Sequence, residues 1–511
     1  MTLVWSAEQV AALRAHLLQE DGQERFAFVY CSESGDDLLV ADIVPVADAD
    51  LGTQSQAGCR PRLAVERDLI QACRRRDLHP LVCHSHPFSQ QPAFSRRDRD
   101  LMDGYRNWLT PLYPDMRLAF AAVGTEGIET AVYDTDSDSF TELSVRVVGD
   151  WRLEPPLSTT EQPAAEAVDT RRFDRSIRAI TDEGQHRLAA AHVGIVGVGG
   201  LGSIMAEELA RYGVNRFTLI DPDHVERSNL PRLFGATDHH VGRPKVDVMR
   251  DHLWRVNPEA EATPVQAMAE NAENALHRCD VLVAGVDRVS TRSFLNEFAV
   301  RHLKYYLDAG VVIGTDDETV ESMEGFIQLV APGANACYDC LDRGDPEWAR
   351  IEQLSDAELN EEIEQGYIDG SELAPEPAVV PLNGLIASKA VTVVAELVTG
   401  YAPPEDFLRF EGLDNELVEL TTHRNDACVT CGQDGMLGRG DSDITMDAVE
   451  PGDSDLDLAL GPAGPAADGD NSAARHHGNS GVHRRLTGLM HRAVQLPQAL
   501  TPSGNDSERG R

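Results

Sequence analysis

A glycine-rich segment carries the clearest chemical signal in this chain of 511 residues. It reads GVGGLGS, follows the apolar stretch His192–Val196 and leads into a helical pattern. Glycine lets the backbone approach a phosphate chain closely, and a helix N-terminus offers free N–H groups to an anion. We therefore expect a nucleotide site here rather than a glycine-rich turn without a ligand. The candidate binding residues are Gly197, Gly199, Gly200, Gly202 and Ser203.

Polar residues beyond this segment indicate what the nucleotide site would do. Asp221 ends the next apolar stretch, Phe217–Ile220, at a separation where a carboxylate can meet a ribose hydroxyl. Cations for a triphosphate and an acid for magnesium suit nucleotidyl transfer, whereas a hydride-transferring enzyme has no evident use for them. Each such residue alone is more often a surface charge or a helix cap, so the prediction depends on their joint occurrence. The residues are Asn229, Arg232, Lys245 and Asp287.

Two Cys-x-x-Cys pairs, Cys337 with Cys340 and Cys428 with Cys431, predict a metal site. Each pair can place two thiolates on one side of a tetrahedral zinc ion. A zinc ion held by four thiolates has no open position, so we expect it to stabilise the fold rather than perform chemistry. The alternative is a redox-active pair, which two matched pairs make less favourable.

A second candidate metal site lies near the N-terminus. In the segment LVCHSHPFSQQPAFSRRD, His84 and His86 stand two residues apart at the end of an apolar stretch, which places both imidazoles on one face. Asp98 can complete a zinc site with an open position for water, and Glu24 can take a proton from that water. Two histidines near a proline in a loop are, on their own, more often not ligands.

Residues 173–432 resemble the ThiF/MoeB family, the adenylating domains shared with ubiquitin-activating enzymes. The segments GVGGLGS, IDPDHVERSNLPR and GRPK carry the resemblance. It implies that Asp221 binds ribose and that Asp287 holds magnesium. The phosphates of ATP would be bound by Asn229, Arg232 and Lys245.

Two further features follow from this resemblance. The segment RRFDRSIR is similar to the family's RYxRQI segment, which implies that Arg175 reaches the ATP of a neighbouring subunit in a homodimer. The family often has glutamine after the phosphate-binding arginine, where this chain has Leu233. Many members also carry the paired Cys-x-x-Cys motif.

No cysteine lies between Cys340 and the apolar segment PLNGLIASKAVTVVAEL, where thioester-forming relatives place their nucleophile. A thiolate is the side chain best suited to form a transferable thioester at neutral pH. We therefore expect the reaction to stop at the acyl-adenylate, which would pass to a sulfur donor, an amine or a separate enzyme.

The first part of the chain resembles the JAB/JAMM metallopeptidase domain, whose signature is an upstream Glu, then HxHP, then S-x-x-D. The resemblance covers about residues 5–150 and implies that His84, His86 and Asp98 bind zinc. It also implies that Glu24 is the general acid/base and that Ser95 stabilises the oxyanion. Eight residues separate His86 from Ser95, one more than is usual in the family.

The order of apolar stretches predicts four regions. An α/β domain of the JAB/MPN type is expected over 1–150 and a Pro- and Glu-rich linker over 151–170. Alternating strands and helices over 171–436 favour a Rossmann-like, doubly wound parallel sheet. Residues 437–511 are rich in Gly, Asp, Ala, Pro and Ser, which predicts a disordered tail.

Composition limits the classes of partner. The chain has 85 acidic against 45 Lys and Arg residues, and its net charge of −40 argues against a nucleic-acid or anionic-membrane surface. No run approaches the roughly 18 consecutive apolar residues of a membrane-spanning helix, and the first residues do not read as a secretion signal. We expect a cytoplasmic protein.

Members of both families often act on the C-terminus of a ubiquitin-like or sulfur-carrier protein that ends in Gly-Gly. The two resemblances together imply a bifunctional enzyme that trims such a carrier and then adenylates the exposed glycine carboxylate. One alternative is an adenylyltransferase whose N-terminal domain only binds the carrier. Another is an enzyme that adenylates a small molecule or a peptide.

Overall fold

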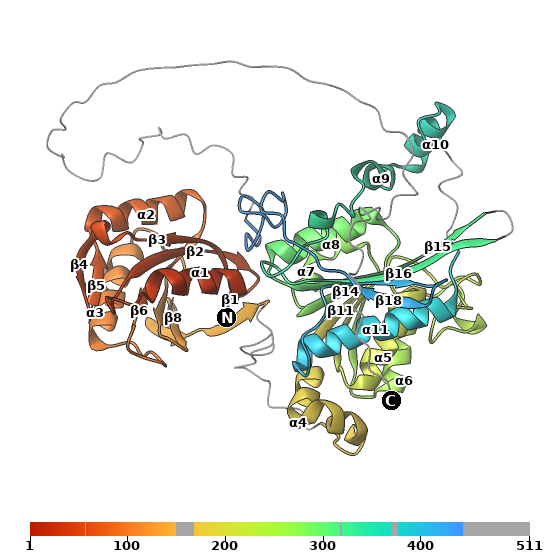
Figure 1. The fold of residues 1–511 in the computed structure, drawn as a ribbon, viewed down its shortest axis with the longest axis horizontal. Helices are drawn as coiled ribbons and strands as arrows, with labels where there is room; N and C mark the ends of the chain where they lie inside the picture. The colour runs from red at the N-terminus through yellow and green to blue at the C-terminus, as the bar shows by residue number, and fades with distance from the viewer. Residues whose placement is uncertain (57, 150–167, 317–318, 369–376, 443–511) are drawn as a thin grey trace, which may run out of the picture. The chain divides into compact units, whose positions relative to one another are not determined.

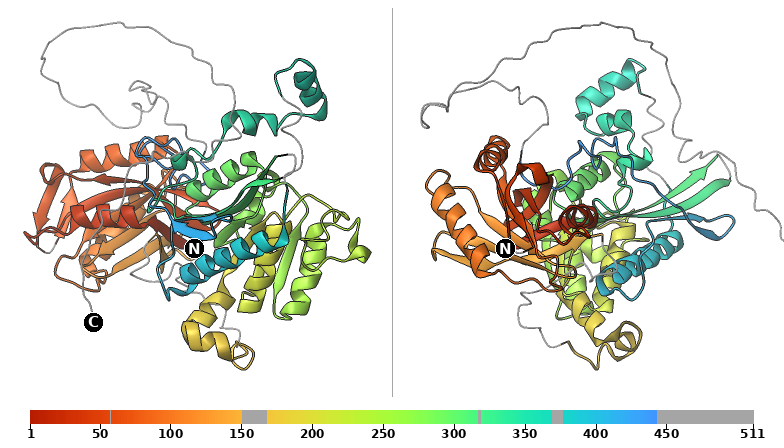
Figure 2. Two further views of the ribbon diagram at one scale, coloured as in Figure 1. Left: turned by 45° about the vertical axis from the view of Figure 1, so that its right-hand side comes forward. Right: turned by 60° about the vertical axis from the view of Figure 1, so that its left-hand side comes forward.

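The computed structural model describes residues 1–56, 58–149, 168–316, 319–368 and 377–442. The described residues belong to one compact unit with two eight-stranded sheets (Figure 1, Figure 2). The predicted linker lies outside the described residues except for 168–170, and the predicted tail lies outside them from residue 443 onward.

The first domain is an α/β structure with helices on both faces of a mixed sheet, coloured red to orange in Figure 1. Its strand order is β10-β1-β3-β2-β6-β7-β8-β9. The strands of this sheet are β1 (Thr2–Ser6), β2 (Phe26–Ser34), β3 (Asp37–Pro45), β6 (His79–Ser85), β7 (Ala119–Val123), β8 (Ile128–Asp134), β9 (Ser139–Glu142) and β10 (Ser144–Val148). A separate hairpin joins β4 (Leu51–Ser55) to β5 (Gly58–Pro61).

Three helices bury the two faces of this sheet. Helix α1 (Ala7–Leu17) packs Leu13 and Leu17 against one face, and a capping box between Ser6 and Gln9 starts it. Helices α2 (Leu63–Arg75) and α3 (Arg96–Leu109) cover the other face, which is rich in aromatic side chains. The prediction of an α/β domain is confirmed at this level.

The second domain contains the predicted Rossmann-like sheet, in the order β13-β12-β11-β14-β15-β16-β17-β18. The first five of these strands run parallel and the last three pair antiparallel. The strands are β11 (His192–Val196), β12 (Arg216–Ile220), β13 (Glu261–Val265), β14 (Val281–Ala284), β15 (Tyr305–Thr315), β16 (Val320–Val330), β17 (Phe407–Glu411) and β18 (Glu416–Glu419). Strand order reverses between β11 and β14, so the loops after these two strands diverge and leave a binding crevice.

Helices cover both faces of the second sheet. One buried cluster joins it to α4 (Asp174–Ala190), α5 (Gly200–Tyr212), α6 (Lys245–Val256) and α11 (Val380–Thr399). The opposite cluster involves α7 (Glu273–Leu276) and α8 (Val289–Arg301). Two further helices are α9 (Pro346–Ile351) and α10 (Asp356–Glu364).

Helix α11 is the one helix among the described residues that is long and apolar enough to cross a membrane by length and composition. Of its most apolar stretch, 72% is buried in the protein. It packs on α5, α4 and β15, which is the environment of a core helix.

The two domains share contacts within the compact unit. Val4, Leu39 and Val148 of the first sheet belong to the same buried apolar cluster as the core of the second domain. The backbone of Gly149 donates a hydrogen bond to the Tyr305 hydroxyl at 2.8 Å.

The folded part extends past the predicted start of the tail at residue 437. Gly438 N donates to Val300 O, Gly440 N donates to Arg301 O, and Asp441 N donates to Glu33 O. Residues 437–442 are therefore ordered against both domains, which corrects the predicted boundary. The amino-acid composition of residues 437–442 gives no sign of these backbone hydrogen bonds to residues that are distant in the sequence.

Candidate functional site

The glycine-rich segment forms the turn between β11 and α5. Gly197 has φ +83°, and a Cβ on Gly202 would lie 1.8 Å from the carbonyl oxygen of Gly197. Only glycine fits this tight reversal. Helix α5 begins at Gly200, so the free N–H groups of its first turn lie at the crevice of the sheet.

Asp221 lies at the end of β12 and is 5% exposed. Its Oδ2 accepts a hydrogen bond from Val198 N at 2.7 Å, so the carboxylate is held against the glycine turn. Burial raises the pKa of Asp221, and the charge of Lys245 opposes that shift. The Nζ of Lys245 lies 2.8 Å from Asp223 Oδ2 and 3.7 Å from Asp221 Oδ1.

Arg232 crosses the glycine turn. A Cβ on Gly200 would lie 3.0 Å from its side-chain carbons, and its Nη1 donates to Ser228 O at 2.9 Å. The Ser203 hydroxyl accepts from Phe234 N at 3.1 Å, and Asn229 Oδ1 accepts from Glu226 N at 3.1 Å. These bonds hold the loop that carries the arginine next to the N-terminus of α5.

Asp287 and Arg175 occupy different surroundings. Asp287 lies three residues beyond the end of β14. Gly285, the first residue after that strand, donates its N–H to Val196 O at 2.9 Å. The acid therefore leaves the sheet beside the glycine turn and is exposed. Arg175 is exposed on α4, with no described contact to the other predicted nucleotide residues.

The four paired cysteines converge. Their Sγ atoms lie within 4.8 Å of one another, with 3.7 Å from Cys337 to both Cys340 and Cys428, and 3.3 Å from Cys340 to Cys431. Zinc–sulfur bonds of about 2.3 Å place thiolates about 3.8 Å apart in a tetrahedron. The donor set and spacing fit a structural zinc ion.

In the first domain, His84, His86 and Asp98 also converge. The two Nε2 atoms are 3.1 Å apart, and Asp98 lies 3.1 Å from His84 Nε2 and 3.4 Å from His86 Nε2. Nitrogen and oxygen ligands at about 2.0–2.1 Å from zinc are separated by about 3.4 Å, so the arrangement fits this metal.

Local structure explains how these ligands are placed. His84 is the second-last residue of β6, between Phe26 of β2 and Ala122 of β7, and His86 N donates to Val123 O. Ser95 is the N-cap of α3: its hydroxyl accepts from Asp98 N, and its own N–H donates to Asp98 Oδ2 at 2.6 Å. The S-x-x-D signature is therefore a capping box that also orients the carboxylate.

Glu24 stands two residues before the start of β2 and is 8% exposed. Burial raises the pKa of Glu24, while the charges of His84 and His86 oppose the shift. A buried carboxyl group beside two imidazoles is placed where a proton acceptor for a metal-bound water would stand.

The loop between His86 and Ser95 packs on the turn that joins β7 to β8. Thr125 N donates to Ser89 O, and Gly127 N donates to Gln90 O. A Cβ on Gly124 would lie 2.6 Å from Ser89 O, so this turn requires glycine. The extra residue of the loop is accommodated away from the three ligands, whose atoms stay together.

The second half of the chain is similar in sequence to known proteins. The profile of the ThiF family matches residues 173–430. The chain belongs to the ThiF family.

Proteins that are similar in sequence to the ThiF domain include named adenylyltransferases. The molybdopterin-synthase adenylyltransferase of Escherichia coli is 32% identical over 271 residues, which are 51% of this chain and 96% of that protein. The sulfur carrier protein adenylyltransferase of Thermus thermophilus is 31% identical over 255 residues, 49% of this chain and 86% of that protein. Among solved structures, E. coli MccB with ATP matches 52% of this chain and 75% of its own at 21% identity and a TM-score of 0.41. The ThiF domain of this chain is an ATP-dependent adenylyltransferase domain.

The ThiF domain contains a buried charged network that sequence reasoning missed. Asp308 is fully buried and lies 2.8 Å from Arg292 Nη1 and 3.0 Å from Arg343 Nη2. Arg292 also donates to Val286 O, next to Asp287, whereas Arg343 follows the first cysteine pair. The network lies between the backbone that precedes Asp287 and the loop that follows the first cysteine pair. Its partners lie on β15, α8 and a loop, so no local motif indicates it.

Asn383 is a second residue that the sequence did not reveal. It lies on α11, is 3% exposed, and its Nδ2 is 2.6 Å from the position of a Cβ on Gly200. Its Oδ1 is buried without a hydrogen-bond partner among the described residues. A buried amide beside the glycine turn is an additional candidate contact for the nucleotide.

Proposed function

We propose that the ThiF domain activates the C-terminal glycine carboxylate of a sulfur-carrier or ubiquitin-like protein. A carboxylate oxygen would attack the α-phosphorus of ATP, the bond to the bridging oxygen would break, and pyrophosphate would leave with magnesium. The observation that supports this proposal is the contact of Asp221 with the glycine turn and with Lys245, while Asp287 follows β14, the strand that pairs with β11. The names of the relatives support the class of substrate.

In this reaction each residue has a distinct task. The carboxylate of Asp221 would bind the ribose, and Asp287 would hold magnesium on the phosphates. The cations would neutralise the charge that develops on the leaving pyrophosphate. The residues that would bind the phosphates are Asn229, Arg232 and Lys245, with Arg175 supplied by the second subunit of a homodimer.

The acyl-adenylate would be the final product of this chain. Residues 341–379 contain no cysteine, so the adenylate would pass to an external sulfur donor, an amine or a separate enzyme.

We further propose that the first domain is a JAMM-type zinc peptidase that trims the same carrier. Zinc, held by His84, His86 and Asp98, would supply a water of lowered pKa. Glu24 would take the proton of that water and return it to the leaving amine. The hydroxyl oxygen of Ser95 accepts the helix-cap bond from Asp98 N, so its O–H would be left to donate to the tetrahedral oxyanion.

The two activities would act in series. Cleavage beyond Gly-Gly produces the free carboxylate that adenylation consumes, and one chain raises the local concentration of that product. This order explains why a peptidase and an adenylating domain would be fused.

The test uses the full chain, ATP, magnesium and small carriers that end in Gly-Gly, each with and without a C-terminal extension. We expect release of the extension and carrier-dependent pyrophosphate from the wild type. With His84→Ala, we expect pyrophosphate from the trimmed carrier only.

Other outcomes separate the alternatives. Pyrophosphate from trimmed carriers without any cleavage by the wild type would make the first domain a carrier-binding module. Pyrophosphate with a peptide or small acid, and with no carrier, would assign a different substrate.

A further inference from the structure

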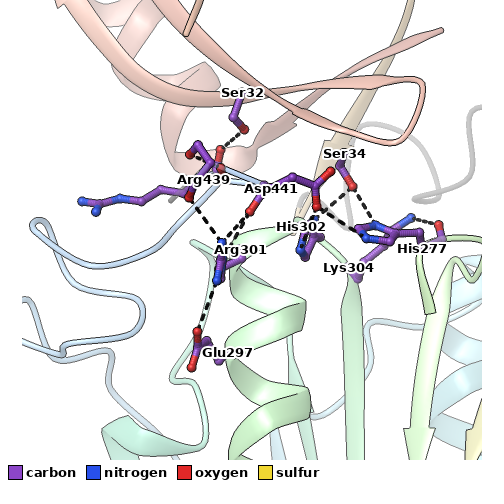
Figure 3. Close-up of polar contacts among 12 residues, drawn as sticks. Ser32, Ser34, His277, Glu297, Arg301, His302, Lys304, Arg439 and Asp441 are labelled. Carbon is purple, nitrogen blue, oxygen red and sulfur yellow. Dashed lines mark hydrogen bonds and ion pairs between the residues drawn. The ribbon is translucent and has the colours of Figure 1, made fainter. Parts of the chain in front are cut away.

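A third group of potential metal ligands lies outside both sites described above. His277 follows α7, His302 follows α8, and Asp441 lies in the short segment after the last cysteine pair. Their ligand atoms lie within 4.8 Å of one another. Figure 3 shows these side chains and Ser34, from the β2–β3 turn of the first domain, pointing toward one another.

The two imidazoles have the same orientation with respect to their partners. Both Nε2 atoms face Asp441 Oδ1, at 3.5 Å for His277 and 3.9 Å for His302. Both Nδ1 atoms face the Ser34 hydroxyl, at 3.1 Å and 3.0 Å. The rings are nearly perpendicular, with centroids 4.5 Å apart.

With two neutral histidines, one ring of this cluster turns an unprotonated Nε2 toward the Asp441 carboxylate. Ser34 has a single hydroxyl proton, so it can donate to only one of the two Nδ1 atoms. The other ring must donate its own Nδ1–H to Ser34, and its Nε2 then presents a lone pair to the carboxylate. A metal ion resolves this conflict, because both rings can donate Nδ1–H to the two lone pairs of the Ser34 oxygen while both Nε2 atoms bind the ion.

The surroundings favour a metal ion over a proton. His302 is 4% exposed and its ring packs on Phe298, with centroids 4.3 Å apart. A charged imidazolium in this place would lose most of its hydration. The nearby cations already have partners: Arg301 donates to the carbonyl oxygens of Gly440 and Ser442, and Lys304 donates to His277 O.

We propose that His277, His302 and Asp441 bind a divalent transition metal ion, with zinc the best fit. Two imidazoles and one carboxylate suit zinc, whose nitrogen and oxygen ligand atoms lie about 3.4 Å apart, and the Nε2–Oδ1 separations of 3.5 Å and 3.9 Å are near that value. Asp441 is exposed, so water can fill the fourth position. The ion would fasten the segment 437–442 to the ThiF domain, with the first domain orienting both histidines through Ser34. This site does not depend on the proposed activities.

The proposal can be tested by metal content in a background that lacks the N-terminal site. The full chain with His84→Ala and His86→Ala is loaded with zinc, freed of excess metal, and analysed by mass spectrometry of the element. We expect two zinc ions per chain, and one after addition of Asp441→Ala. The matched control Asp434→Ala removes an acid from the same segment without touching the cluster, and should keep two.

Cobalt titration identifies the ligands of a weaker site. In the same background, the first equivalent of cobalt should give the strong absorption of cobalt bound to thiolates. The second equivalent of cobalt should give only the weak visible bands of nitrogen and oxygen ligation. Asp441→Ala and His277→Gln should each abolish the second phase and leave the first.

Asp441→Ala tests metal binding rather than folding, because Asp441 is exposed and the variant retains its backbone hydrogen bond to Glu33 O. Its melting temperature with EDTA should equal that of the Asp434→Ala control, and added zinc should raise the melting temperature of the control further than that of the variant, in which only the four-thiolate site can fill. A zinc count and a cobalt titration that are the same with and without the Asp441 side chain would overturn the proposal.

Discussion

The nucleotide crevice and the N-terminal metal site are built on the same principle but differ in how their charges are balanced. Both stand where a strand ends beside the first turn of a helix. In the crevice, Lys245 pairs with Asp223 and Asp221, and Arg232 bonds to a carbonyl oxygen. The charged groups are therefore stabilised without ATP, and the ligand must replace these partners.

The N-terminal site concentrates its ligand atoms instead. His84, His86 and Asp98 direct their atoms at one point within 3.1–3.4 Å, beside a buried Glu24. Clustered donor atoms of this kind suit a cation at their centre. The charges of the crevice are thus already balanced without its substrate, whereas the N-terminal group has the arrangement of a site for a resident ion.

The largest effect is expected from Asp287→Ala. Loss of the magnesium ligand should lower carrier-dependent pyrophosphate release about a thousandfold, since metal stabilisation of the transition state amounts to several kcal/mol. Cleavage of an extended carrier is the internal control and should be unchanged. A parallel fall in cleavage would show that the two sites are not independent.

Glu24→Gln should lower peptide release about a hundredfold or more, the usual contribution of a general base. Its zinc content should equal that of the wild type, because Glu24 is not among the three converging ligands. Adenylation of a trimmed carrier serves as the control. Loss of zinc from this variant would contradict the separation of ligand and base.

Arg232→Lys should weaken the ATP reaction about tenfold, mainly through the KM for ATP. Lysine keeps the charge, but it loses the planar fork that can bond Ser228 O and a phosphate together. ATP–pyrophosphate exchange measures the effect. Unchanged kinetics would mean that Arg232 contacts only its own loop.

The smallest effect is expected on stability, from Ser95→Ala, which removes the N-cap of α3 together with the proposed oxyanion donor and should therefore also lower peptide release. It should cost about 1 kcal/mol of unfolding free energy, measured by denaturant titration. Ser95→Thr keeps the cap oxygen and should restore that stability. If Ser95→Ala lowers peptide release and leaves the unfolding free energy unchanged, Ser95 acts on the substrate alone.

Local motifs made much of the two sites predictable. The apolar stretch His192–Val196 is β11 as observed. Ser95 and Asp98 lie within one helical turn, and each cysteine pair lies within one tight turn. Short separations leave few conformations, so their residue types are enough to indicate how they are arranged.

Other features required the tertiary structure. The Arg292–Asp308–Arg343 network, the position of Asn383 beside Gly200, and the group of His277, His302 and Asp441 all join segments that are distant in sequence. None has a spacing that a local rule can recognise.

The sequence by itself determined the types of chemistry: a phosphate-binding turn, a four-thiolate cluster, and a group of two imidazoles and one carboxylate. Strand order and domain packing decided which distant residues complete each site and where the folded chain ends. The physical reason is that turns and caps depend on neighbouring residues, whereas buried ion pairs and convergent ligands depend on which strands and helices pack side by side.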